Sequence, residues 1–219
     1  MISKTVENYL KNIFLLSENN KVVTTNEISK KLKIKASSAS DMLKKMNDKG
    51  LLNYEKYNGV SLTVKGKKIA TTIVRKHRLW ETFLVKKLNF KWDEVHEVAE
   101  QLEHIDSEKL VSLLDNYLGY PEFDPHGDPI PNIHGTFPKT NSIAINKLKI
   151  NAKGTVMGVL QDNKEFLMFL NKIGINIGSL IQVKNILKFD DSIEIKINKK
   201  EYLITLELAR NILVKKEEN

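Results

Sequence analysis

Cysteine is absent from the 219 residues, and long apolar runs are absent too. Without cysteine the chain has no disulfide framework and no thiolate ligand for zinc or an iron–sulfur cluster. No stretch approaches the roughly 18 apolar residues of a membrane-spanning helix, and the N-terminus lacks the apolar core of a signal peptide. These absences predict a cytoplasmic protein without a membrane anchor.

Motifs of catalysis are also missing. There is no cysteine nucleophile, no Gly-x-Ser-x-Gly and no His-Glu-x-x-His. The ten glycines are scattered, so no glycine-rich phosphate loop is formed. We therefore expect a protein that is not an enzyme.

Charge is plentiful and unevenly distributed. The formal net charge is +8, but residues 1–75 carry +9, residues 76–139 carry −5 and residues 140–219 carry +4. A basic block followed by an acidic block indicates one surface for a polyanion and one for cations. A merely lysine-rich solvated surface would give the same totals, so charge alone does not decide between them.

The basic block has the pattern of a winged helix-turn-helix. Apolar spacing predicts helices over 6–16, 24–32 and 36–47, the second opened by Thr24 and Glu27 as a capping box. Two strands, 51–57 and 60–64, then meet at Asn58-Gly59, a strong hairpin sequence. We expect DNA contacts from the third helix and the hairpin, through Ser37, Ser38, Ser40, Asp41, Lys44, Lys56 and Tyr57. A winged helix used only for protein contacts is the alternative.

Three further helices are predicted over 66–88, 92–103 and 107–118, with enough apolar surface for a dimer interface. A proline-rich loop over 119–135 follows. From residue 141 the chain alternates as short strands, with one helix over 163–172, which indicates a small β-barrel.

Histidines and carboxylates recur at helical spacing on two of these helices. His77 and Glu81 are one turn apart on the first. Four residues share a stripe on the second: His96, Glu100, Glu103 and His104. Imidazole and carboxylate without thiolate suit Mn²⁺, Fe²⁺, Co²⁺ or Zn²⁺. A solvated helix face is the plainer interpretation of such a stripe.

The sequence resembles the diphtheria-toxin-repressor-like family of metal-dependent transcriptional regulators, in its manganese-regulator type. Three segments carry the resemblance in order: 74–81 (VRKHRLWE), 95–104 (VHEVAEQLEH) and 125–131 (PHGDPIP). Segment 170–178 resembles the SH3-like domain of longer members. The resemblance implies an α+β protein: a winged-helix DNA-binding domain at 1–72, a helical dimerisation and metal-binding domain at 73–140, and an SH3-like domain at 141–219.

The resemblance also implies two metal sites. The primary site takes Glu100, Glu103 and His104, with Asn8 from the first helix. The ancillary site takes His77, Glu81 and His96, with Asp162 and Glu165 from the barrel. His126 and His134 match the family's loop and are expected to order that loop or face solvent.

Two positions bear on which metal is bound. Position 100 is cysteine in iron-type members and Glu100 here, and an oxygen ligand favours Mn²⁺. Lys11 stands where manganese regulators have a second acidic residue, so their two-metal cluster cannot form unchanged. We expect Mn²⁺, with Fe²⁺ as the alternative and Zn²⁺ or Co²⁺ binding in vitro.

The expected function is metal-activated repression of metal-uptake genes by a homodimer on palindromic operator DNA, without a role at a membrane. A winged-helix regulator of a small organic ligand is the main alternative. A metal-dependent enzyme and an adaptor that uses its barrel for protein partners are two others.

Overall fold

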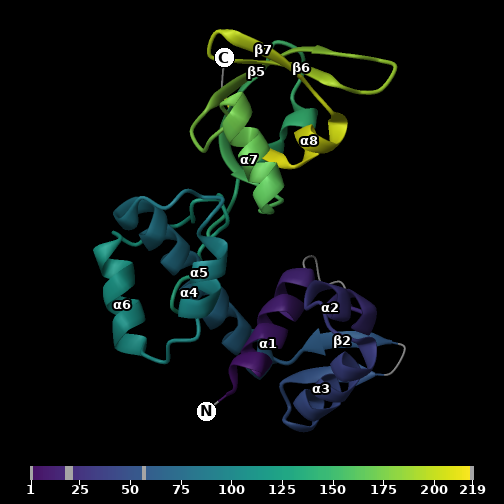
Figure 1. Cartoon of the computed structure of the whole chain (residues 1–219), viewed down its shortest axis with the longest axis vertical. Coiled ribbons are helices and arrows are strands. Elements are labelled where there is room, and N and C mark those ends of the chain that lie inside the picture. Colours follow the sequence, from purple (N-terminus) through teal and green to yellow (C-terminus); the bar gives the residue numbers. More distant parts are fainter. Residues whose placement is uncertain (1, 18–21, 56–57, 218–219) are drawn as a thin grey trace. The chain divides into compact units, whose positions relative to one another are not determined.

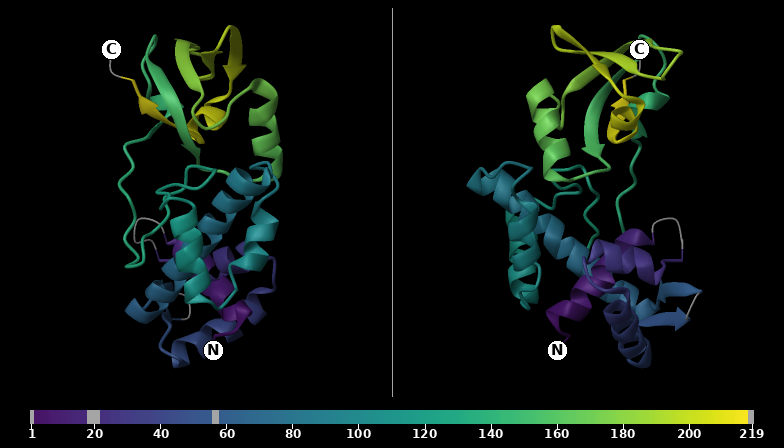
Figure 2. Two further views of the ribbon diagram at one scale, coloured as in Figure 1. Left: turned by 90° about the vertical axis from the view of Figure 1, so that its left-hand side faces the viewer. Right: turned by 45° about the vertical axis from the view of Figure 1, so that its right-hand side comes forward.

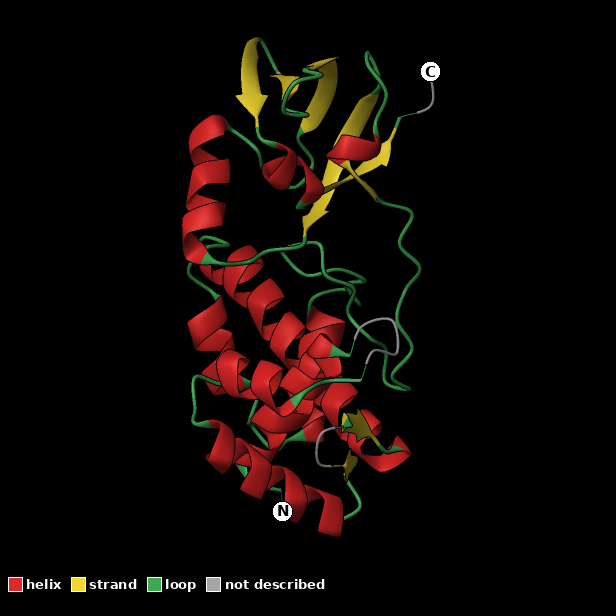
Figure 3. Ribbon diagram, turned by 90° about the vertical axis from the view of Figure 1, so that its right-hand side faces the viewer, coloured by secondary structure: helices red, strands yellow, loops and turns green. Residues whose placement is uncertain are grey.

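A computed structural model describes residues 2–17, 22–55 and 58–217. The chain folds as the predicted α+β protein, with helices in its first half and an antiparallel sheet at its C-terminal end (Figures 1 and 3). It divides into two compact units. Unit 1 comprises Met1–His77, Glu100–Glu108 and Pro131–Phe137, and unit 2 comprises Arg78–Ala99, Lys109–Ile130 and Pro138–Asn219. Among the described residues no helix is long and apolar enough to cross a membrane.

Unit 1 contains the predicted winged helix-turn-helix: α1 (Lys4–Leu16), α2 (Thr25–Lys31), α3 (Ala36–Asp48), β1 (Leu52–Glu55) and β2 (Gly59–Leu62). The predicted capping box is present, because the Thr24 side chain accepts a hydrogen bond from the Glu27 amide and the Glu27 carboxylate accepts one from the Thr24 amide. The apolar faces of the three helices close one core around Leu10, Ile28 and Leu43, all fully buried.

Gly59, predicted to lie in the hairpin turn, is the first residue of β2. Gly59 is not part of a two-residue turn, since it lies in β2 and pairs with Glu55. A side chain at Gly59 would also meet the backbone of Val23, which forms an isolated bridge with Val60. Glycine at this position therefore allows a close approach of two chain segments.

Three helices follow the hairpin: α4 (Val64–Leu88), α5 (His96–Leu102) and α6 (Glu108–Tyr117). The prediction for α5 was too long at both ends, because residues 92–94 form turns and Glu103 and His104 lie in a turn after the helix. Helix α4 crosses the boundary of the two units, with His77 the last residue of unit 1 and Arg78 the first of unit 2 on this helix.

Unit 2 carries a six-stranded antiparallel sheet in the order β3-β8-β4-β5-β6-β7. Its strands are β3 (Ile143–Ala144), β4 (Lys153–Val159), β5 (Leu180–Ile186), β6 (Ile193–Ile197), β7 (Lys200–Ile204) and β8 (Ile212–Lys216). A 3-10 turn, η2 (Ile145–Lys147), and the helices α7 (Lys164–Ile173) and α8 (Leu206–Arg210) complete this region. Helix α7 lies beside the sheet and buries Leu167 and Leu170 in its core (Figure 2).

The proline-rich loop is fastened to this sheet. The Val159 amide of β4 donates to the His126 carbonyl at 2.9 Å, and a Cβ on Gly127 would lie 2.0 Å from the Met157 carbonyl oxygen. Trp92 packs into the sheet's core, and its indole donates to Asn171 Oδ1 of α7 at 2.9 Å. Trp92, which precedes α5, and the loop at 124–127 are therefore both fastened to the sheet region within unit 2.

Gly66 provides a test of the packing in unit 1. In an ordinary helix a Gly→Ala change stabilises by roughly 0.5–1 kcal/mol. At Gly66 the added Cβ would lie 1.9 Å from the Leu51 carbonyl oxygen, which is backbone and cannot move aside cheaply. We expect Gly66→Ala to destabilise by about 1–3 kcal/mol in urea unfolding, whereas Lys65→Ala on the exposed face should change stability little. A more stable Gly66→Ala protein would contradict the packing described here.

Candidate metal centre

Most of the histidines and acids singled out in the sequence fall into two groups, which also include residues that were not singled out. The first, here named the α1 cluster, lies in unit 1 and comprises Glu7, Lys11, His77, Glu100, Glu103 and His104. The second, the α4 cluster, lies in unit 2 and comprises Glu81, His96, Asp124, His126 and Asp162. The stripe predicted on one helix is thus divided, with His96 in the second group and its other three members in the first.

Glu103 is the centre of the α1 cluster and has no exposed surface. Its two carboxylate oxygens lie 2.7 and 2.8 Å from Lys11 Nζ, and Oε2 also lies 2.6 Å from His77 Nδ1. Lys11 reaches Glu100 Oε1 as well, at 3.4 Å. Because a buried carboxylate is costly unless it is compensated, these partners are what allow Glu103 to lie inside the protein.

His104 is oriented by a residue that the sequence interpretation missed. Its Nδ1 lies 2.6 Å from Glu7 Oε2 on α1, and a carboxylate at neutral pH only accepts, so Nδ1 carries the proton in this pair. The lone pair of a neutral His104 is then on Nε2, which faces Glu103 Oε1 at 3.7 Å. A carboxylate behind a histidine is a common arrangement at metal sites, because it fixes the tautomer and the ring orientation.

Asn8, the predicted ligand from the first helix, is only half-buried, next to Glu7. The hydrogen bond recorded for it uses its backbone carbonyl, which accepts from Asn12 Nδ2 at 2.8 Å. The acidic residue beside it, Glu7, makes the contact with His104. Spacing alone could have suggested Glu7, since it lies one turn before Lys11 on the same helix.

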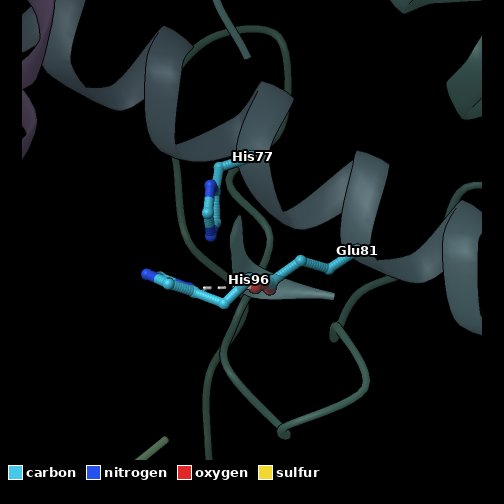
Figure 4. Close-up of side chains that lie close together, drawn as sticks. All are labelled: His77, Glu81 and His96. Atoms are coloured by element: carbon cyan, nitrogen blue, oxygen red, sulfur yellow. Dashed lines mark hydrogen bonds and ion pairs between the residues drawn. The ribbon is translucent and has the colours of Figure 1, made fainter. Parts of the chain in front are cut away.

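The α4 cluster is built around Glu81, whose carboxylate is almost fully buried. His96 Nδ1 lies 3.3 Å from Glu81 Oε1 and 3.9 Å from Asp162 Oδ2. Figure 4 shows His77 and Glu81 on one helix with His96 opposite them, and the three offer ligand atoms within 4.8 Å of one another. Asp162 precedes the Asn163 cap of α7 and is therefore not helical. Glu165 is exposed on the first turn of α7, outside both groups.

His126 also belongs to the α4 cluster, so its interpretation as a loop-ordering or solvent residue was incomplete. It is buried, and its Nδ1 lies 3.5 Å from Glu81 Oε2 and 4.0 Å from Asp124 Oδ1. Its Nε2 donates to the Trp92 carbonyl at 2.7 Å, which leaves Nδ1 directed at the two acids. Glu81, Asp124 and His126 form a second set of three ligand atoms within 4.8 Å. His134, by contrast, is exposed.

The electrostatics of this pocket follow from burial. Burial lowers the pKa of His126, but the hydrogen bond with Glu81 and the charges of Glu81 and Asp124 outweigh it and raise the pKa to about 9. Burial, with the repulsion of Glu81 and Asp128, raises the pKa of Asp124 to about 8, against the opposing charges of His126 and Arg78. A positive charge near Glu81 and Asp124 is thus strongly favoured.

Both clusters have the donors that a divalent transition metal takes. In the α1 cluster the buried Glu103 Oε1 lies 3.7 Å from His104 Nε2, and its partner among the described residues is the Lys11 ammonium at 2.7 Å rather than a hydrogen-bond donor of good geometry. In the α4 cluster three or more imidazole and carboxylate ligand atoms converge. Oxygen and nitrogen donors without sulfur fit Mn²⁺, Fe²⁺ or Zn²⁺.

The predicted DNA-contacting residues are placed on the outer face of α3. Ser37, Ser38, Asp41 and Lys44 are exposed there and Ser40 is half-buried. The Lys44 ammonium lies 3.8 Å from Asp41. Lys56 and Tyr57 fall outside the described residues.

Comparison with known proteins gives matches along nearly the whole chain. Residues 1–60 match the model of the iron dependent repressor N-terminal DNA binding domain. Residues 63–132 match its metal binding and dimerisation domain, and residues 143–216 match the FeoA domain. These three segments follow one another in the order expected from the sequence.

Individual relatives agree with these domain matches. An uncharacterized HTH-type transcriptional regulator of Methanocaldococcus jannaschii is 39% identical over 114 residues, which are 52% of this chain and 91% of that protein. The iron-dependent repressor IdeR of Mycobacterium leprae is 34% identical over 129 residues, 59% of this chain and 56% of that protein. This chain therefore matches little more than half the length of the mycobacterial relative.

Solved structures extend the likeness to the full chain. A manganese-dependent transcriptional repressor in complex with manganese superposes with a TM-score of 0.86 at 33% identity, over 97% of this chain and 100% of that one. ScaR with bound Zn²⁺ superposes with a TM-score of 0.79 at 31% identity, over 97% and 99%. With both repressor domains and the FeoA domain present, the chain belongs to the iron-dependent repressor family of metal-dependent transcriptional repressors.

Proposed function

We propose that this chain is a Mn²⁺-activated repressor of metal-uptake genes, with Fe²⁺ as the alternative ion. One observation carries the proposal: the α1 cluster joins the first helix of the DNA-binding segment to the end of α5 in the metal-binding segment. Glu7 and Lys11 come from α1, and Glu103 and His104 come from the turn after α5. A cation held here links the two segments through their charged side chains.

The α1 cluster would hold its ion through Glu103, His104 and Glu100, with Asn8 as a further oxygen donor. The ion would add positive charge beside Glu100 and Glu103, whose negative charges Lys11 and His77 balance only in part. Glu7 keeps the His104 ring oriented, and the buried His77 holds Glu103 Oε2, so that Oε1 and His104 Nε2 face each other before an ion arrives. This preorganisation lowers the cost of binding.

The choice of Mn²⁺ rests on donor chemistry. Glu100, Glu103 and His104 offer oxygen and nitrogen ligands. The site has no sulfur ligand, which is the ligand type that would favour a softer metal over Mn²⁺. The solved relatives support the same choice, since the first of them is described with manganese. Availability of the ions in the cell also influences which metal fills such a site.

The α4 cluster is a second candidate site. The distances of His96 Nδ1 from Glu81 and Asp162 support these three as ligands, and His77 offers a ligand atom within 4.8 Å of those of Glu81 and His96. We add His126 and Asp124 to this set, because both are buried and converge on Glu81. Glu165 is the predicted ligand for which the structure offers no support.

The DNA-binding step follows from the winged helix. Exposed serines near the start of α3 allow close approach to base edges, and the surrounding lysines meet phosphates. We expect a homodimer whose two α3 helices enter successive major grooves of a palindromic operator. An ion that binds the DNA-competent arrangement more tightly than the alternatives would then control operator affinity.

Removal of the ion tests the function. Duplex DNA selected from a random pool in the presence of Mn²⁺ should bind the protein with Mn²⁺ and lose most of its affinity in EDTA, measured by fluorescence anisotropy at fixed salt. The double variant Glu103→Ala, His104→Ala should bind equally weakly in both conditions while circular dichroism shows it folded. Asp106→Ala, an exposed acid near the site, should behave like the wild type.

Equal operator affinity in Mn²⁺ and EDTA for the wild type would overturn metal activation. That result would instead favour the alternative of a winged-helix regulator that responds to a small organic ligand. Binding of uptake-gene promoters in vivo is the measurement that tests which genes are controlled.

His126 tests the second site. His126→Ala removes a buried nitrogen directed at Glu81, so we expect the α4 site to bind Mn²⁺ about 10–100-fold more weakly in isothermal titration calorimetry. His134→Ala is the matched control, because it removes an exposed histidine from the same loop. Unchanged Mn²⁺ affinity and stoichiometry in His126→Ala would show that His126 only orders the loop.

A further inference from the structure

Lys11 is a buried cation at the centre of the α1 cluster. Its side chain is 5% exposed, although lysine is among the residues least often buried. Its ammonium group lies between both oxygens of Glu103, at 2.7 and 2.8 Å, and reaches Glu100 Oε1 at 3.4 Å. Two of the acids proposed to hold the metal are thus already paired with a positive charge from the protein.

The ammonium and a metal ion need the same atoms. Glu103 Oε2 is shared between Lys11 and His77, and Oε1 lies at ion-pair distance from Lys11 while accepting no hydrogen bond from the described residues. An ion bound to Glu103 Oε1 and His104 Nε2 would approach the ammonium within a few ångströms. Two cations that close repel each other strongly in a buried environment.

We propose that Lys11 is a tethered competitor of the metal. In the metal-free protein its ammonium pairs with Glu103 and Glu100, and the metal binds only when the ammonium withdraws from Glu103. Lys11 therefore weakens metal binding and sets the concentration at which the repressor responds. The proposal rests on the metal-binding function proposed above.

The length of the lysine side chain makes the withdrawal feasible. The ammonium is carried on a flexible stem of four methylene groups, so it can exchange Glu103 for Glu100, whose side chain is half exposed to solvent. The Lys11 ammonium would then remain paired with Glu100, at the solvent-exposed side of the cluster. An arginine could compete in the same way through its own charge, whereas an uncharged side chain could not.

The test compares Lys11→Met with the wild type. Methionine fills the space without charge, and loss of a charge-assisted hydrogen bond that opposes binding should tighten Mn²⁺ binding to the α1 site by about tenfold or more in calorimetric titration. Lys11→Arg should retain the weak affinity of the wild type. Lys4→Met is the matched control, because it removes an exposed charge from the same helix and should leave Mn²⁺ affinity unchanged.

A second readout does not depend on affinity. Metal-free Lys11→Met should melt at a lower temperature than the wild type, because Glu103 loses its cation, and added Mn²⁺ should raise its melting temperature by more than it does for the wild type. If Lys11→Met folds poorly, Lys11→Gln serves for the same measurements, since its amide can donate to Glu103 without charge.

The outcomes separate this inference from the function on which it rests. Mn²⁺ binding by the wild type with equal or weaker binding by Lys11→Met would overturn competition and show that Lys11 positions Glu103 instead. Absence of Mn²⁺ binding in the wild type and in every variant would overturn the proposed metal site itself.

Discussion

The arrangement of unit 1 depends on one buried carboxylate. Glu103 has no exposed surface and is surrounded by Lys11, His77 and His104, each supplied by a different part of the chain. A carboxylate in that position is stable only while cations or hydrogen-bond donors face it, so the segments that supply them must come together. The same requirement makes the site sensitive to any change in the number of positive charges around it.

Helix α4 relates this carboxylate to the second cluster. His77 donates toward Glu103, and Glu81 lies one turn further along the same helix, where His96 and His126 approach it. Each cluster therefore has a buried acid paired with histidine. In the α4 cluster the positive charge comes from His126, whose pKa is raised to about 9, where in the α1 cluster it comes from Lys11.

Most of the fold could be predicted from the sequence, and the site only in part. Apolar periodicity and the Thr24–Glu27 capping box predict the helices of the winged helix from local sequence. The alternation of apolar and polar residues likewise predicts the strands of the sheet. The stripe on α5 was misinterpreted, because periodicity cannot show that the helix ends before Glu103 and that a turn directs Glu103 and His104 away from His96. His126 was missed because its approach to Glu81 depends on a loop fastened to β4, a long-range contact with no local pattern.

The uneven charge of the sequence acquires a physical meaning at Lys11. The basic N-terminal block would be expected to use its lysines on DNA, yet this one is buried among acids of the acidic block. A site made only of carboxylates and histidine would repel itself without metal and would bind any divalent ion tightly. A tethered ammonium relieves that repulsion, so the metal-free fold remains intact, and it makes every incoming ion compete with a charge that belongs to the protein. The same ion pair thus stabilises the metal-free protein and weakens the binding of the metal.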